Sequence, residues 1–247
     1  MEPEQQPEQY EEEPILLDED GFEVLSLHEH GVDFESYLPP LRTIPEGGTR
    51  DDASYVNWGF TIYRTAYGGT TDQAWQTLLR KIQDDLAEEG AYYKEHHDDY
   101  WSTKPANPEA ADKFMSLFKL DPRSDPDLLE GATMAQVREI YQKGIGGPPM
   151  THEIPQYHLF LLADTEVLDA VAKGEFWMKC VQGEYKAEDY TIKDEEGVPT
   201  EQLFYYGYIK MTVQSLLVLW DRLSIRNLGD FSPPFIEEPV RIWNGDW

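Results

Sequence analysis

An arginine within an apolar strand pattern is the residue of this sequence that most strongly suggests a binding site. Arg64 follows Trp58, Phe60 and Ile62 at two-residue intervals in the stretch NWGFTIYRTAY, so we expect it on the same face of a strand. A guanidinium group on such a face must either pair with a carboxylate or lie at the end of the sheet.

Two roles for Arg64 are compatible with the sequence. The first, which is the commoner one, is a structural ion pair with Asp164 or Glu184. The second is a pocket at the end of the sheet, where the guanidinium group binds a carboxylate or phosphate ligand and polar groups converge in an aromatic setting. The ligand-binding candidates for that pocket are Arg64, Tyr67, Lys179, Tyr206 and Tyr208.

The histidines do not have the spacing of a zinc site. His28 and His30 lie two residues apart, so on a strand both imidazoles would share a face and could bind a transition metal with an acid from elsewhere. His96 and His97, followed by two aspartates, form a second group. Sequence-adjacent polar residues in acidic loops are usually solvated, so we expect no metal and no cofactor.

The motifs of nucleophilic and phosphate chemistry are also lacking. Cys180 falls in the strand pattern MKCV, where an inert buried thiol is usual, and a nucleophile would need an electropositive setting and a base such as His158. The loops YGGTTD and GIGGPP lack the GxxxxGK[ST] spacing, and the chain has no GxSxG motif. The sequence therefore favours a non-catalytic protein, with an enzyme as the alternative.

The elements that must position these residues alternate between strand and helix patterns. Strand patterns lie at 57–67, 157–163, 176–181 and 204–211, with a short edge strand at 240–243. Helix patterns begin near Thr71, Pro108, Thr133, Asp164 and Thr212, and the first of them is expected to stop at Gly90. This order predicts an α+β fold with a mostly antiparallel sheet of about four strands and helices packed on one face. A decorated ferredoxin-like arrangement is one form of it.

The chain divides into a tail and one domain. Residues 1–20 contain nine acids and no Lys or Arg, which predicts a disordered acidic tail. The apolar group Ile15, Leu16 and Leu17 within it either docks on a partner or packs back on the domain. Residues 21–247 are expected to form a single domain, in which 91–150 is a helical insertion.

Charge limits the class of partner. The 20 Lys and Arg residues against 48 Asp and Glu residues give a formal net charge of −28. A field of this sign repels phosphate backbones and anionic lipids and attracts basic proteins, so we expect neither direct nucleic-acid binding nor membrane binding. A single cysteine, no signal-like N-terminus and no apolar run of about 20 residues favour the cytoplasm, with the nucleus second.

Scattered positions between Trp58 and Ile236 carry a family resemblance. They are Phe60, Ile62, Arg64, Thr65, Tyr67, Trp75, residues 125–131, Val137, Arg138, Phe160, Asp164, Met211, Val213, Leu216, Leu219, Pro233, Pro234 and Ile236. Through them the chain resembles a large group of fungal, chiefly ascomycete, proteins that have no assigned activity. The resemblance implies a family but no chemistry.

Two functional hypotheses follow from the sequence. The leading one is a non-catalytic interaction protein that binds basic partner proteins through its acidic surface and tail. The alternative is a small-ligand-binding protein or an enzyme with a pocket around Arg64 at the end of the sheet. The sequence makes no prediction of oligomeric state.

Overall fold

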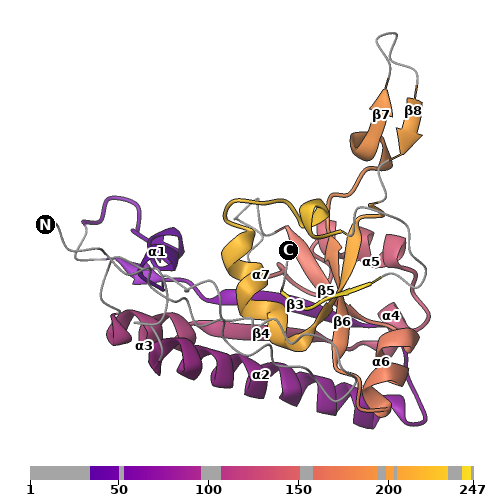
Figure 1. Cartoon of the computed structure of the whole chain (residues 1–247), viewed down its shortest axis with the longest axis horizontal. Helices are drawn as coiled ribbons and strands as arrows, with labels where there is room; N and C mark the ends of the chain where they lie inside the picture. Colours follow the sequence, from indigo (N-terminus) through magenta and orange to yellow (C-terminus); the bar gives the residue numbers. More distant parts are fainter. Residues whose placement is uncertain are drawn as a thin grey trace, which may run out of the picture.

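The computed structural model of the chain describes residues 34–49, 53–95, 107–150, 158–193, 199–202, 205–232 and 241–245. A mixed sheet of six strands, with helices packed against it, forms the centre of this part of the chain (Figure 1). The predicted tail at 1–20 lies outside the described residues, as do His28, His30, His96 and His97.

The sheet has the strand order β10-β9-β6-β5-β3-β4. Its strands are β3 (Trp58–Arg64), β4 (Phe118–Arg123), β5 (Leu159–Ala163), β6 (Trp177–Gln182), β9 (Tyr208–Thr212) and β10 (Ile242–Trp243). Strand β3 is parallel to both β4 and β5, the β5–β6 and β6–β9 pairs are antiparallel, and β10 is parallel to β9. All residues of β3 and β5 are buried, as expected for central strands that are apolar throughout.

The α+β class is confirmed, but the predicted sheet of about four mostly antiparallel strands is wrong, and a ferredoxin-like arrangement is therefore wrong too. The strand that the sequence analysis missed is β4, whose sequence FKLDPR contains a proline and two cations and has weak strand propensity. The proline is tolerated because β4 lies at the edge of the sheet, where β3 is its one strand partner among the described residues. Residues 91–150, expected as a helical insertion, thus contribute a sheet strand as well as helices.

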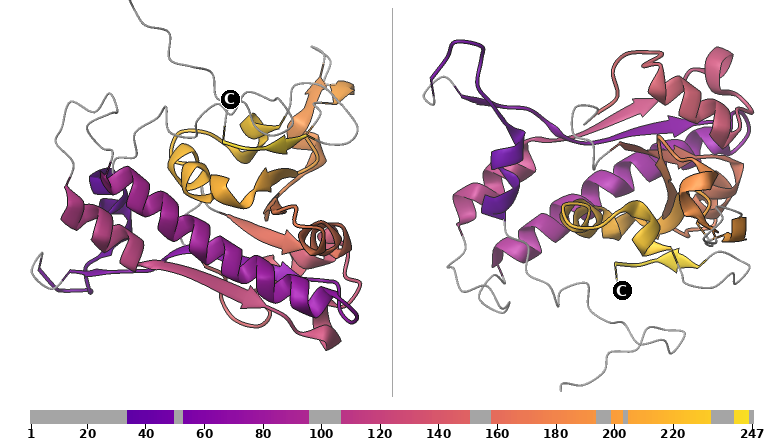
Figure 2. Two further views of the ribbon diagram at one scale, coloured as in Figure 1. Left: turned by 60° about the horizontal axis from the view of Figure 1, so that its bottom comes forward. Right: turned by 90° about the horizontal axis from the view of Figure 1, so that it is seen from above.

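The main core lies on one face of the sheet. Trp58, Phe60 and Ile62 of β3 pack there against three helices, and the long helix runs the length of this layer (Figure 2). These helices are α2 (Thr71–Glu95), α6 (Thr165–Ala172) and α7 (Leu216–Arg222). Two further helices, α3 (Pro108–Ser116) and α1 (Phe34–Tyr37), extend the layer, with α1 packed on α3.

The opposite face is covered as well, so the prediction of helices on one face is wrong. Helices α4 (Pro126–Leu129) and α5 (Met134–Gln142) lie here. Val137 and Ile140 of α5 belong to a second core with Tyr63 and Phe160, which alternate along their strands with residues of the first core. Helical periodicity identified a buried stripe on α5, but it carries no information about which side of a sheet the stripe faces.

The remaining elements are short. They are η1 (Pro39–Leu41), β1 (Arg42–Thr43), β2 (Ser54–Tyr55), η5 (Ala187–Tyr190), β7 (Thr191–Lys193), β8 (Pro199–Gln202), η6 (Val213–Ser215) and η7 (Leu228–Phe231). Strands β1 and β2 pair as one antiparallel hairpin, and β7 and β8 as another. None of the helices in the described part of the chain is long and apolar enough to cross a membrane.

The observed starts of the helices agree with the predictions from the sequence better than the observed ends do. Thr133 caps α5 in a reciprocal capping box with Gln136, and the Asp164 carboxylate accepts from the Val167 amide at the start of α6. The predicted stop at Gly90 is wrong, because α2 continues to Glu95. Gly90 serves instead at the contact between α2 and α3, described below.

Candidate functional site

Arg64 is buried and paired at the junction of β3 and α2. Its side chain is only 5% exposed, and its Nε donates to the Ala66 carbonyl oxygen at 2.7 Å. The Nη2 group donates to Thr71 Oγ1 at 3.1 Å and forms an ion pair with Asp72 in the first turn of α2. The expected kind of pairing is present, but the expected partners, Asp164 and Glu184, were wrong.

The five ligand-binding candidates do not meet in one place. Tyr67 joins Arg64, with its hydroxyl donating to the Arg64 carbonyl oxygen at 2.9 Å and its ring centroid 4.5 Å from the guanidinium carbon. Lys179 lies beside Leu162 in the sheet register, on the α5 side, whereas Arg64 lies beside Ala163 on the α2 side. Tyr208 is near Lys179, with 6.0 Å between the ammonium nitrogen and the ring centroid, and Tyr206 is half exposed.

Lys179 belongs to an ion network that the sequence analysis missed. Its Nζ contacts Asp164 Oδ2 at 2.6 Å and Glu166 Oε2 at 2.7 Å, and the cross-strand neighbour Lys210 contacts Glu166 Oε1 at 2.5 Å. Burial alone would raise the pKa of Glu166, but hydrogen bonds from both ammonium groups outweigh it and lower that pKa. The network connects α6 to β6 and β9. The sequence feature that could have predicted it is the lysine in the middle of each of these two apolar strands.

The thiol and imidazole candidates do not form a catalytic pair. Cys180 is fully buried, and burial raises the pKa of its thiol, which removes the thiolate needed for attack. His158 Nδ1 instead lies 3.5 Å from Glu184 Oε1. Within the described ranges, no cluster of three His, Cys, Asp or Glu residues could hold a metal ion.

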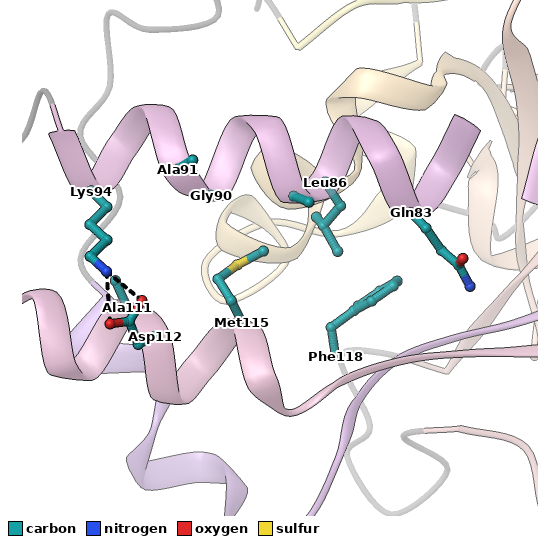
Figure 3. Close-up of a pocket in the computed structure, with 10 residues that line it drawn as sticks. Gln83, Leu86, Gly90, Ala91, Lys94, Ala111, Asp112, Met115 and Phe118 are labelled. Carbon is teal, nitrogen blue, oxygen red and sulfur yellow. Dashed lines mark hydrogen bonds and ion pairs between the residues drawn. The ribbon is translucent and has the colours of Figure 1, made fainter. Parts of the chain in front are cut away.

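A groove lies between α2 and α3. It has a volume of about 320 Å³, and its floor is formed by Leu86, Met115 and Phe118 (Figure 3). Lys94 and Asp112 stand at one end, joined by contacts of 2.6 and 2.7 Å from the Lys94 ammonium group to both carboxylate oxygens. The groove thus has an apolar floor and a polar end.

Small residues create this groove. A Cβ atom at position 90 would lie 2.6 Å from Met115 Cε, so a larger residue there would require the flexible end of the Met115 side chain to move. Ala87, Ala91 and Ala111 fill little of the space between the two helices. Positions 87, 90 and 91 lie on one face of α2, because residues three and four apart in a helix share a face. This spacing of small residues is the sequence feature that could have predicted the groove.

Acidic side chains surround the apolar floor. Asp84 and Glu88 are exposed beside the groove-lining residues of α2, and the Asp112 side chain is 65% exposed. The charge of Lys94 is already engaged by Asp112, which leaves the carboxylates of α2 as the dominant free charge along this stretch. The groove therefore suits a cationic ligand better than an anionic one.

A second acidic pair lies buried on the adjacent face of α2. Glu89 is 8% exposed, and neither of its carboxylate oxygens has a hydrogen-bond partner among the residues that the structure describes. Burial, together with the nearby Asp85 carboxylate, raises the pKa of Glu89 to about 8. Asp85 itself contacts Lys81 at 2.5 Å. At neutral pH Glu89 is mostly protonated, so the exposed acids define the charge around the groove.

Comparisons of the chain with models of protein families, with curated proteins and with solved structures found no match. The resemblance to the fungal group therefore stays a prediction.

Proposed function

We propose that this protein is a non-catalytic interaction protein, and that its groove between α2 and α3 binds a basic segment of a partner protein. The observation that carries the proposal is the combination of an apolar floor, made by Leu86, Met115 and Phe118, with exposed carboxylates beside it. A helix with one apolar and one basic face matches this combination, as in other helix-in-groove complexes.

The apolar floor would supply affinity. An apolar side chain that becomes fully buried contributes about 1.5–3 kcal/mol, and a groove of this size has room for a small number of such side chains. Part of that energy offsets the loss of translational and rotational freedom on association, so we expect a modest affinity from the groove alone.

Charge would supply partner selection. The formal net charge of −28 attracts basic partners over long distances and repels acidic ones. Interactions between exposed charges are screened beyond about 10 Å at 0.1 M salt, so binding should weaken as salt rises. A reducing compartment, the cytoplasm or the nucleus, fits a chain whose single cysteine is a buried free thiol.

The small-ligand alternative has less support. Arg64, on which it depended, already donates to Ala66, Thr71 and Asp72, and Lys179 is engaged by two carboxylates on the other face of the sheet. A ligand that binds Arg64 would first have to displace the Asp72 carboxylate.

A synthetic amphipathic helix tests the proposal. The probe carries leucines at helical spacing and lysines elsewhere, and its matched control has glutamate in place of lysine. We expect the lysine peptide to bind, and Ala91→Phe, which fills the groove, to weaken binding by at least about tenfold, or about 1.4 kcal/mol. The control variant Ala135→Phe places the same ring at an exposed position of α5 on the opposite side of the sheet.

Titration calorimetry at low and high salt would measure these affinities. Equal affinity for the two peptides would contradict the role of charge. Equal binding by the wild type and Ala91→Phe would contradict the groove as the binding site. Unfolding midpoints of both variants serve to confirm that each remains folded.

A further inference from the structure

A second pocket lies on another side of α3. It has a volume of about 460 Å³, and its apolar wall includes Leu38, Pro39 and Tyr55 from the α1 segment and the β1–β2 hairpin. Its lining also includes two cations, Arg42 and Lys113, and two carboxylates, Glu35 and Glu109. The Glu35 carboxylate is engaged by the Asn107 side-chain amide at 2.7 Å.

Exposed apolar side chains gather beside this pocket. Ile44, Tyr55 and Val56 are 49%, 37% and 40% exposed, and all three lie in or next to the β1–β2 hairpin. The Lys113 ammonium group lies 5.1 Å from the Tyr55 ring centroid and, within the described residues, forms no ion pair with a carboxylate. Cations and exposed apolar surface therefore coincide here on a chain of strongly negative charge.

We propose that this pocket binds the segment around Ile15, Leu16 and Leu17 of the same chain. Those three apolar residues are flanked in EEEPILLDED by six acids and no cation. The apolar side chains match the Leu38 and Tyr55 wall, and the flanking carboxylates match Lys113. Lys94 at the α2–α3 groove is paired with Asp112, whereas Lys113 at the pocket forms no ion pair among the described residues, so the acidic segment is directed to the pocket and not to the groove.

The connection along the chain is long enough for residues 15–17 to reach the pocket. Residues 18–33 separate Leu17 from Phe34, and sixteen residues span up to about 53 Å when extended. Phe34 and Tyr37 of α1 pack on Phe114 of α3, with ring centroids 5.7 and 5.2 Å away, so the connection starts beside the pocket. A tether of this length gives an effective concentration on the order of millimolar, at which a weak contact is sufficient.

Hydrogen–deuterium exchange of the full chain tests the proposal. We expect the amides of 15–17 to exchange slower than in an unstructured peptide by on the order of tenfold. Leu16→Asp and Lys113→Glu should each abolish the protection, and adding Glu12→Lys with Glu13→Lys to Lys113→Glu should restore it. Lys173→Glu changes an exposed cation at the C-terminal cap of α6; it is the matched control and should leave the protection unchanged.

Three results would overturn the proposal. The first is no protection of 15–17 in the wild type, and the second is protection that survives both Leu16→Asp and Lys113→Glu. The third is protection that disappears on dilution, which would assign the contact to a second copy of the chain. Ala91→Phe in the groove should not change the protection, so failure here and failure of the proposed function are distinguishable.

Discussion

Gly90 of α2 and Met115 of α3 approach so closely that a Cβ atom at position 90 would lie 2.6 Å from Met115 Cε and 2.9 Å from Met115 Sδ. The same pair borders the groove proposed to bind the partner. A mid-helix glycine is disfavoured by about 1 kcal/mol relative to alanine, and at position 90 this cost accompanies a close contact with the end of the Met115 side chain.

A double-mutant cycle at positions 90 and 115 measures the energetic coupling between the two residues. In the wild-type background, Gly90→Ala gains helix propensity but pushes the Met115 side chain, so we expect little net change in the free energy of unfolding. In a Met115→Ala background the clash is absent, and Gly90→Ala should stabilise by about 1 kcal/mol. Urea unfolding of the four proteins gives the coupling energy. An identical effect of Gly90→Ala in both backgrounds would show that the close approach has no energetic consequence.

Arg64 and Asp72 should differ greatly in their importance although they form one ion pair. Removing Arg64 leaves the Ala66 carbonyl oxygen without the Arg64 donor in a buried place, whereas Asp72 is 69% exposed and can be solvated. We expect Arg64→Ala to destabilise by about 2–4 kcal/mol and Asp72→Asn by less than about 1 kcal/mol.

Chemical denaturation of both variants checks this order. Arg64→Lys is the informative control, because it keeps the charge but loses the planar fork that serves several acceptors at once. If Arg64 has a structural role, we expect Arg64→Lys to lower the free energy of unfolding, as Arg64→Ala does. If Arg64→Ala were as stable as the wild type or more stable, the residue would be retained for something other than folding, and the ligand-binding alternative would regain support.

The sequence predicted the central elements well for a physical reason. Strands at 57–67 and 157–163 and the cap at Thr133 depend on local features, namely apolar runs and side-chain-to-backbone hydrogen bonds. Strand β4 could not be found this way, because its FKLDPR sequence becomes a strand only through pairing with β3 at the edge of the sheet.

The candidate site was harder to predict than the fold. Arg64 drew attention because a charged residue in an apolar strand is conspicuous, yet its partner, Asp72, lies only eight residues away on the next helix. The groove depends on the absence of side-chain volume at positions such as Gly90 and Ala91, from two helices whose packing the sequence does not specify. Small residues also occur in turns and at helix ends, which is why Gly90 was interpreted as a stop.

Glu89 makes the stability of the fold depend on pH. Its pKa of about 8 in the folded protein is far above the ordinary value of 4.5, because burial and the Asp85 carboxylate both disfavour the charged form. Between pH 4.5 and 8 the folded state therefore holds a proton that the unfolded chain has released. Stability contributed by this group is complete below pH 4.5 and is lost as the pH rises towards 8.

Glu89→Gln should remove that dependence, because the amide is neutral throughout. Relative to the wild type, we expect the variant to gain more than about 1 kcal/mol in the free energy of unfolding at pH 8, and little near pH 4.5. Glu88→Gln, at the exposed neighbouring position, is the matched control and should show no such trend. Urea unfolding at several pH values measures both. A Glu89→Gln effect that is the same at pH 4.5 and pH 8 would mean that Glu89 is ionised in the folded protein, and that the buried face of α2 carries a charge beside the groove.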